Sequence, residues 1–186
     1  MTARAFWLLP GLVLAACTGL RTVRPDVFRS PQPGEDQLAR RIEALGIRTV
    51  VCLRLAGEGN AASARAAEGA SIAFWHVPMS ATRLPSAATL LELWRVAASA
   101  RRPLLLHCLA GIDRTGLASA ILVLHDTGDL AQARRELALV PHGHLGVFGT
   151  ESMREVLDRY EGHAGRLTFP EWVREVYATE VAPSPH

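Results

Sequence analysis

The 186-residue chain contains no lysine, and all 20 of its basic residues are arginine. A bias this uniform is typical of the composition of a whole genome, so residue type alone gives no arginine a function. The 18 acidic residues leave a formal charge of only +2. This near-neutrality excludes a bulk electrostatic attraction to nucleic acid or to an anionic surface. Any recognition of anions must therefore be local.

Cysteine is scarce, with three residues in the chain, and the composition shows no extreme. Hydrophobic residues make up 49% of the chain and charged residues 20%, close to the usage of globular proteins. These values exclude a disulfide-stapled, collagen-like or disordered chain. The length suits one domain with a substantial core and is too short for two.

The chain also lacks a membrane-spanning run, because its N-terminal apolar segment ends too early. That segment covers residues 6–16, well short of the roughly 20 apolar residues that a span requires. With Arg4 before it, the segment is typical of an export signal over residues 1–16.

The end of this segment, Leu14-Ala15-Ala16-Cys17, resembles the bacterial lipobox. The resemblance implies that Cys17 becomes the lipidated first residue of the mature protein, held at the periplasmic face of the cell envelope. Thr18 stands where Asp would signal retention at the inner membrane, which favours the outer membrane. An ordinary secretory signal with an incidental cysteine is the alternative. We expect a tether over residues 17–25 and one domain over residues 26–181.

Short apolar segments alternate with amphipathic ones in the first two thirds of that domain. The apolar segments show no clean alternation, as expected of parallel strands covered on both faces. This order predicts an α/β fold, with a central, mostly parallel sheet of four to five strands flanked by helices. The expected strands cover residues 49–53, 72–77 and 104–107, and the expected helices residues 35–45, 61–68, 86–100, 115–125, 129–139 and 150–160, with a last helix after Pro170.

One segment, His107-Cys108-Leu109-Ala110-Gly111-Ile112-Asp113-Arg114-Thr115-Gly116, connects a predicted buried strand to a predicted buried helix. A loop that enters a helix directs unpaired backbone N–H groups and the positive end of the helix dipole at one place, which forms an anion site. These donors favour the thiolate of Cys108 over the thiol. Arg114 is positioned to hold two oxygens of a phosphate.

The segment resembles the Cys-x5-Arg loop of the cysteine-dependent tyrosine and dual-specificity phosphatases, most closely that of small atypical bacterial members. Residues 28–33 and 47–54 are similar to sequence segments common in that group. The resemblance implies a dual-specificity phosphatase-like fold and a monomer without metal or cofactor. It also implies hydrolysis of phosphomonoesters through a phosphocysteine. The substrate would be a phosphorylated protein or a small molecule, phosphotyrosine-like or an inositol phosphate.

The resemblance also implies roles for single residues. Cys108 would attack phosphorus, and Thr115 would ease departure of the thiolate. His107 would help to set the conformation of the loop and the pKa of the Cys108 thiol. Arg29 would reach the phosphate pocket, although a surface salt bridge is its alternative. The phosphate would be bound by Arg114 and by the backbone amides of Leu109, Ala110, Gly111, Ile112 and Asp113.

The general acid of many relatives is missing, because no Asp occurs between residues 61 and 102 and the expected loop, residues 76–83, has no carboxylate. Asp113 is one candidate, with a scaffolding role as the alternative, His76 is another, and the absence of any acid is a third possibility. A phosphatase without a dedicated acid loses most on alkyl phosphates, whose leaving oxygen is strongly basic. We therefore expect a preference for aryl phosphates or phosphoanhydrides.

Two other functions remain open. One is a catalytically silent envelope lipoprotein that binds phosphate or phospholipid. The other, sulfur or arsenate chemistry, is disfavoured by the Arg-Thr-Gly ending of the loop. Cys52, in an apolar strand, is either a core residue or a disulfide partner of Cys108.

Overall fold

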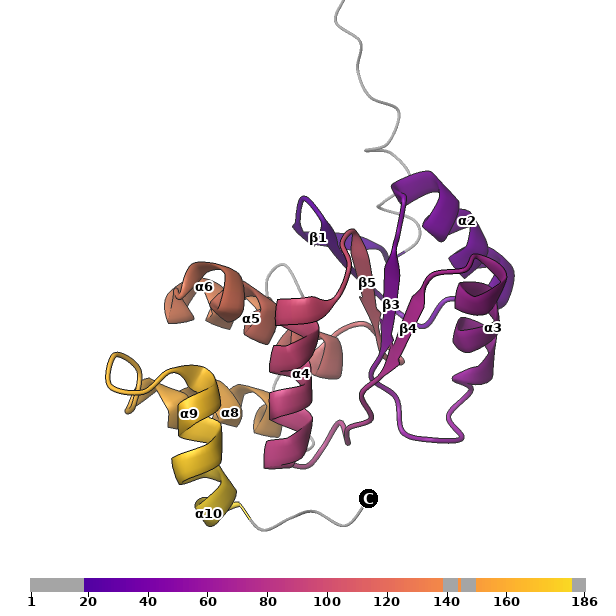
Figure 1. The fold of residues 1–186 in the computed structure, drawn as a ribbon. Helices are drawn as coiled ribbons and strands as arrows, with labels where there is room; N and C mark the ends of the chain where they lie inside the picture. The colour runs from indigo at the N-terminus through magenta and orange to yellow at the C-terminus, as the bar shows by residue number, and fades with distance from the viewer. Residues whose placement is uncertain (1–18, 139–143, 145–149, 182–186) are drawn as a thin grey trace, which may run out of the picture.

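A five-stranded sheet forms the centre of the computed structural model, which describes residues 19–138, 144 and 150–181 (Figure 1). The strands lie in the order β1-β2-β5-β3-β4. Only β1 runs antiparallel to its neighbour, so the predicted α/β class and mostly parallel sheet are confirmed. The strands are β1 (Arg21–Arg24), β2 (Val27–Ser30), β3 (Thr49–Cys52), β4 (Ala73–His76) and β5 (Leu104–His107).

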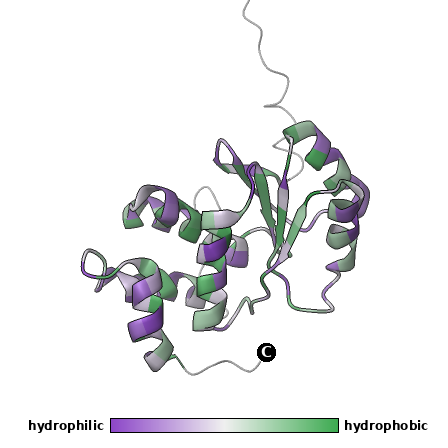
Figure 2. Ribbon diagram, viewed as in Figure 1, coloured by the Kyte–Doolittle hydropathy of each residue, from purple (hydrophilic) through white to green (hydrophobic). Residues whose placement is uncertain are grey.

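The central strands are buried on both faces, which explains their continuous apolar runs. All four residues of β3 and all four of β5 are buried, and the two strands pair in register from Thr49 with Leu104 to Cys52 with His107. The strands are drawn mostly as hydrophobic in Figure 2, whereas the outer helices mix both residue types. Because β2, β5, β3 and β4 run parallel, their C-terminal ends lie at the same edge of the sheet.

Strand β1 corrects the prediction that residues 17–25 are a tether. Its residues pair with β2 through a turn at Pro25 and Asp26, and Val23 packs against the core. Sequence analysis missed this strand because three of its four residues are polar and its first two are exposed.

Two layers of helices cover the sheet (Figure 1). One face carries α2 (Glu35–Leu45) and α3 (Ala61–Gly69), which contribute Leu38, Ile42 and Ala66 to a small core with β3 and β5. The main core lies on the other face, with α4 (Ala87–Ser99), α5 (Asp113–Thr127), α6 (Leu130–Arg134), α8 (Glu151–Glu161) and α9 (Phe169–Trp172).

Helix α5 passes through the main core, as its apolar character predicts. Eleven consecutive residues from Arg114 to Leu124 are buried. The helix begins at Asp113, two residues before the predicted start, so that Asp113 and Arg114 belong to its first turn. It ends at Gly128, whose φ of 68° is a left-handed conformation that glycine adopts without a steric penalty.

The helices after α5 partly differ from prediction. The helix expected over residues 129–139 consists of α6 and one 3₁₀ turn, η2 (Arg135–Leu137), whereas α8 lies where expected. The last helical segment runs from α9 through a π-helical stretch, η3 (Val173–Tyr177), to α10 (Ala178–Glu180). Trp172 and Tyr177 in this segment are fully buried in the main core.

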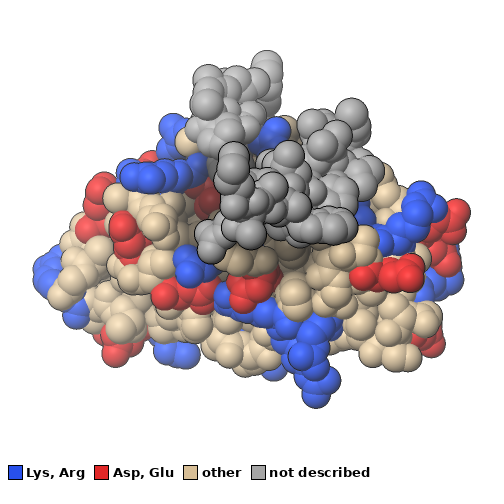
Figure 3. All heavy atoms as spheres, turned by 90° about the horizontal axis from the view of Figure 1, so that it is seen from above, with Lys and Arg blue, Asp and Glu red and all other residues tan. Residues whose placement is uncertain are grey.

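The export signal and the lipidation site at Cys17 lie outside the described residues and stay predictions. In the described part of the chain, no helix has the length and apolar character needed to cross a membrane. Acidic and basic side chains of the described residues lie interspersed on the face shown in Figure 3, in agreement with the small net charge.

Candidate active site

The loop between β5 and α5 lies at the edge of the sheet where the parallel strands end. A backbone amide and an arginine side chain behind the loop hold it in place. The amide of Gln32 donates to the carbonyl of Leu109 at 3.0 Å, and Arg29 donates to the carbonyls of Gly111 and Ile112 at 3.1 Å and 2.8 Å. In a planar trans peptide the N–H and C=O point in opposite directions. The amides that follow these three carbonyls therefore point away from Arg29 and Gln32, toward the other side of the loop.

Arg29 lies elsewhere than the resemblance implied. Its side chain is fully buried behind the loop and donates from Nε and Nη2 to Gly111, from Nη2 to Ile112, and from Nη1 to both the backbone and the carboxylate of Glu136. All three guanidinium nitrogens are thus occupied by protein groups. Arg29 supports the loop between β5 and α5 from behind, and its ion pair with Glu136 is buried rather than on the surface.

Cys108 begins the loop, with 3% of its surface exposed, and its Sγ accepts a hydrogen bond from the Gly111 amide at 3.3 Å. Gly111 can turn this amide toward the sulfur because its φ is 72°, in the left-handed region. The same position lies against the backbone of Ser30 and Pro31. A Cβ on Gly111 would lie 2.4 Å from the Ser30 carbonyl carbon and 2.5 Å from the Pro31 nitrogen, so only glycine fits.

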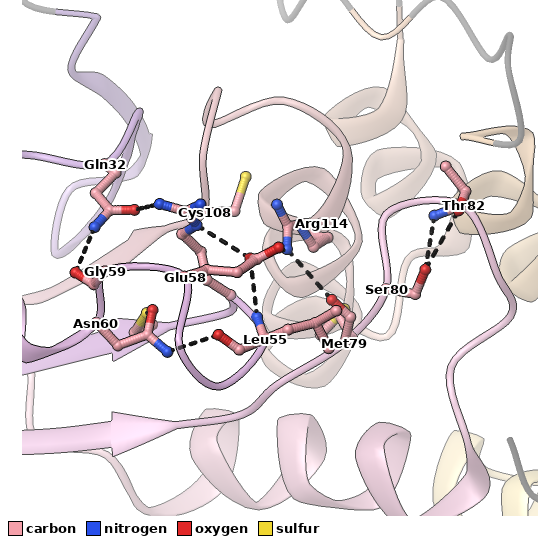
Figure 4. A network of polar contacts seen from close by, with 12 residues as sticks. Gln32, Leu55, Glu58, Gly59, Asn60, Met79, Ser80, Thr82, Cys108 and Arg114 are labelled. Carbon is pink, nitrogen blue, oxygen red and sulfur yellow. Dashed lines mark hydrogen bonds and ion pairs between the residues drawn. The ribbon is translucent and has the colours of Figure 1, made fainter. Parts of the chain in front are cut away.

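Arg114 lies in the first turn of α5, and its predicted role in phosphate binding stays a prediction. Its guanidinium is nearly buried, and Nη1 donates to the Met79 carbonyl at 3.4 Å and to Oε2 of Glu58 at 3.1 Å. Figure 4 shows these contacts above the strand ends. Arg114 therefore binds an oxygen of the Glu58 carboxylate.

Glu58 is a site residue that sequence reasoning missed, because it precedes the segment in which relatives carry their acid. Its Oε2 also accepts hydrogen bonds from Arg54 Nε at 3.1 Å and from the Leu55 amide at 3.0 Å. Partial burial acts to raise the pKa of Glu58, but the hydrogen bonds from Arg114 and Arg54 outweigh it and the pKa lies below its ordinary value. Glu58 is thus a carboxylate at neutral pH and a poor proton donor.

The structure separates the two side chains predicted as general acids. His76, at the end of β4, has its Nε2 2.7 Å from the Arg54 carbonyl and 3.1 Å from Asn60 Nδ2. Asp113 instead lies at the start of α5, with its Oδ1 2.7 Å from Nδ1 of His144. The segment at residues 78–83 carries Ser80 and Thr82, which contact each other, and supplies no carboxylate (Figure 4).

Cys52 and Cys108 are both free and buried, so the structure contains no disulfide between them. The Sγ of Cys52 donates to Oδ1 of Asn60 at 3.4 Å. Burial raises the pKa of the Cys52 thiol, which keeps it protonated and unreactive. This arrangement supports the role of Cys52 as a core residue.

His107 and Thr115, on either side of the loop, are completely buried. Within the described residues, the two ring nitrogens of His107 have no hydrogen-bond partner. The hydroxyl of Thr115 has none either. Burial lowers the pKa of His107 to about 4. The imidazole is therefore neutral in the folded protein at neutral pH.

The buried His107 makes stability dependent on pH. An unfolded histidine titrates near pH 6.5, so as the pH falls the unfolded chain takes up this proton before the folded one does. We expect the free energy of unfolding to fall between about pH 6.5 and pH 4, by up to about 3 kcal/mol from this group. Urea denaturation at several pH values measures the loss. The variant His107→Gln should show a shallower slope in this range, and an unchanged slope would contradict the assignment.

The comparisons with known proteins agree with this geometry. Residues 22–138 match the family described as "DSP-PTPase phosphatase fused to NAD+ Kinase". A search of curated proteins found no match. Among solved structures, TpbA from P. aeruginosa is similar with 24% identity and a TM-score of 0.60, over 76% of this chain and 84% of that one. PTPMT1 is similar with 15% identity and a TM-score of 0.58, over 80% and 99%.

A further structure of P. aeruginosa TpbA, a variant in complex with pTyr, is 24% identical with a TM-score of 0.57, over 85% of this chain and 91% of that one. At these identities the likeness establishes the fold, which is the dual-specificity phosphatase-like fold expected from the sequence. The family match covers more than half of the chain and includes the whole loop from His107 to Gly116. The chain therefore belongs to this family of DSP-PTPase phosphatases.

Proposed function

We propose that this chain hydrolyses phosphomonoesters through a phosphocysteine formed on Cys108. The observation that carries the proposal is the position of its sulfur. Cys108 Sγ accepts the Gly111 amide at 3.3 Å, at the N-terminus of the 15-residue helix α5, whose first turn supplies Arg114. The N–H groups that would stabilise a bound phosphate therefore lie beside the attacking sulfur.

The reaction follows from the groups around the loop. The thiolate attacks phosphorus, a bond forms between Sγ and phosphorus, and the bond to the leaving oxygen breaks. Arg114 and the loop amides stabilise the equatorial oxygens, after Arg114 exchanges the Glu58 carboxylate for phosphate. Water then attacks phosphorus, and the sulfur leaves as a thiolate. Asp113 is the proposed group that protonates the leaving oxygen and later accepts the proton of water.

The rim of the loop favours an aryl phosphate as substrate. Two large hydrophobic side chains are exposed among the described residues, and both belong to the site: Leu109 is 58% exposed within the loop and Leu55 is 37% exposed beside Glu58. Apolar surface of this kind suits an aromatic ring better than a polyol. The pTyr found with the TpbA variant supports the same substrate class.

Activity on a matched pair of peptides tests the proposal, one with phosphotyrosine and one with phosphoserine, assayed with a chelator present. We expect phosphate release from both, with kcat/KM for phosphotyrosine higher by about 100-fold or more because the leaving phenol is less basic. Equal values would contradict the aryl preference. Release from neither peptide, with phosphate still bound, would instead support a silent phosphate-binding protein.

A further inference from the structure

The side chain of His144 is buried against the phosphate loop. Only 1% of this residue is exposed, and its Nδ1 lies 2.7 Å from Oδ1 of Asp113, although the two are 31 positions apart in the chain. The Asp113 side chain is 25% exposed, so part of the carboxyl-bearing side chain is open to solvent. Within the described residues, Asp113 has no other side-chain hydrogen bond.

This contact exceeds what a scaffolding aspartate requires. A carboxylate in the first turn of a helix can be satisfied by the free N–H groups there, without a histidine. The Nε2 atom of His144 is buried and has no partner within the described residues. A buried ring nitrogen without a partner destabilises the folded protein, and such groups in native structures call for a functional explanation.

Two other ionisable side chains near the loop, Glu58 and His76, are engaged in hydrogen bonds with protein groups. Glu58 accepts three hydrogen bonds on Oε2, from Arg114, Arg54 and Leu55, which hold it as a carboxylate. The Nε2 of His76 lies 2.7 Å from the Arg54 carbonyl, to which its proton is donated. Among the described residues of the site, Asp113 is therefore the acidic side chain that is not hydrogen-bonded to an arginine, and it is the candidate to exchange a proton with substrate.

We propose that His144 is a positioning residue for Asp113, and that the two side chains work as one proton-transfer pair in the reaction proposed above. The hydrogen bond from Nδ1 fixes the carboxyl group at Oδ1 and directs Oδ2 toward the leaving oxygen. This inference rests on the proposed function, since it assigns a partner to the acid of that reaction.

The proton balance of the pair is simple. As the bond from phosphorus to the leaving oxygen breaks, its electron pair stays on that oxygen, which takes the proton from Oδ2. Asp113 becomes a carboxylate, which the Nδ1–H of His144 stabilises. In the second step a water molecule attacks phosphorus and gives its proton to Oδ2, and the electron pair of the sulfur–phosphorus bond returns to Cys108. The pair is then restored.

Two substitutions separate positioning from mere packing. His144→Asn keeps an N–H donor near the place of Nδ1, whereas His144→Leu keeps the bulk and removes the donor. Each variant is assayed with para-nitrophenyl phosphate and phenyl phosphate, whose leaving groups differ in basicity. The readout is kcat/KM, which reports on formation of the phosphocysteine. Thermal unfolding of every variant shows whether it folds.

We expect His144→Leu to lower kcat/KM for phenyl phosphate by about 100-fold and that for para-nitrophenyl phosphate by less than about 10-fold, as expected for loss of acid catalysis. His144→Asn should recover most of the loss on phenyl phosphate. The double variant with Asp113→Asn should be no slower than Asp113→Asn alone, because residues that act as one unit are not additive.

Equal losses on both substrates, or independent effects of His144→Leu and Asp113→Asn, would overturn the pairing. Either result would leave the phosphocysteine reaction intact as long as Cys108→Ser remains inactive. If Cys108→Ser retained the activity of the parent protein, the proposed function itself would fail. The two failures are thus distinguishable in one set of assays.

Discussion

Serine in place of Cys108 is expected to lower phosphate release from para-nitrophenyl phosphate by at least about 10,000-fold. A serine hydroxyl stays protonated at neutral pH, and among the described residues the hydrogen-bond contact of Sγ is the donor N–H of Gly111, which cannot accept its proton. Binding of inorganic phosphate should persist, since Arg114 and the loop amides remain. Steady-state kinetics and calorimetric phosphate titration measure the two effects.

Cys52→Ser is the matched control for this experiment. Cys52 is the other cysteine in the described part of the chain and is also free and buried, but its Sγ donates to Asn60. A serine hydroxyl can make the same contact, so we expect near-normal activity from this variant. Loss of activity in Cys52→Ser together with full activity in Cys108→Ser would reverse the assignment of the nucleophile.

Alanine in place of Gly111 is expected to distort the loop and remove most activity. The added Cβ would lie 2.4–2.6 Å from three backbone atoms of Ser30 and Pro31, and the φ of 72° disfavours any side chain. Conformational strain and overpacking together should cost about 3 kcal/mol of stability or more. We expect kcat/KM to fall by at least about 100-fold, because a displacement of about 1 Å at a catalytic group has that effect.

Gly128→Ala separates the clash from the conformational strain. Gly128 has a nearly equal φ of 68°, at the end of α5, but its Cβ would contact nothing within 4 Å. This variant should lose only about 1 kcal/mol of stability and keep its activity. Urea denaturation and activity assays of both variants measure the difference. Equal losses of activity would show that the fit of Gly111 against Ser30 and Pro31 is unimportant.

The sequence was sufficient to predict strands β3, β4 and β5, the buried helix α5 and the loop between β5 and α5, but neither β1 nor β2. Parallel strands and a central helix leave long apolar runs, and the Cys108 to Arg114 spacing depends only on local chain geometry. Arg114 needs no long-range contact to fold back over the loop. These features are local, so a single sequence carries them.

The residues that support the loop could not be predicted in the same way. Arg29 is 107 positions from Glu136, and Glu58 is 56 positions from Arg114. Such contacts depend on how the chain folds back on itself, which local patterns do not encode. His144 shows the same limit, because the sequence leaves open whether a histidine beside Gly143 lines the pocket or is an exposed loop residue, whereas its imidazole is buried against Asp113.

The most direct test of the phosphocysteine reaction is to trap the intermediate. The wild-type chain is mixed with a ³²P-labelled aryl phosphate, quenched within milliseconds and digested, and the labelled peptide is identified by mass spectrometry. We predict label on Cys108 that forms within one turnover and then decays, and no label in Cys108→Ser. Turnover without label on Cys108, or label on another residue, would contradict the account.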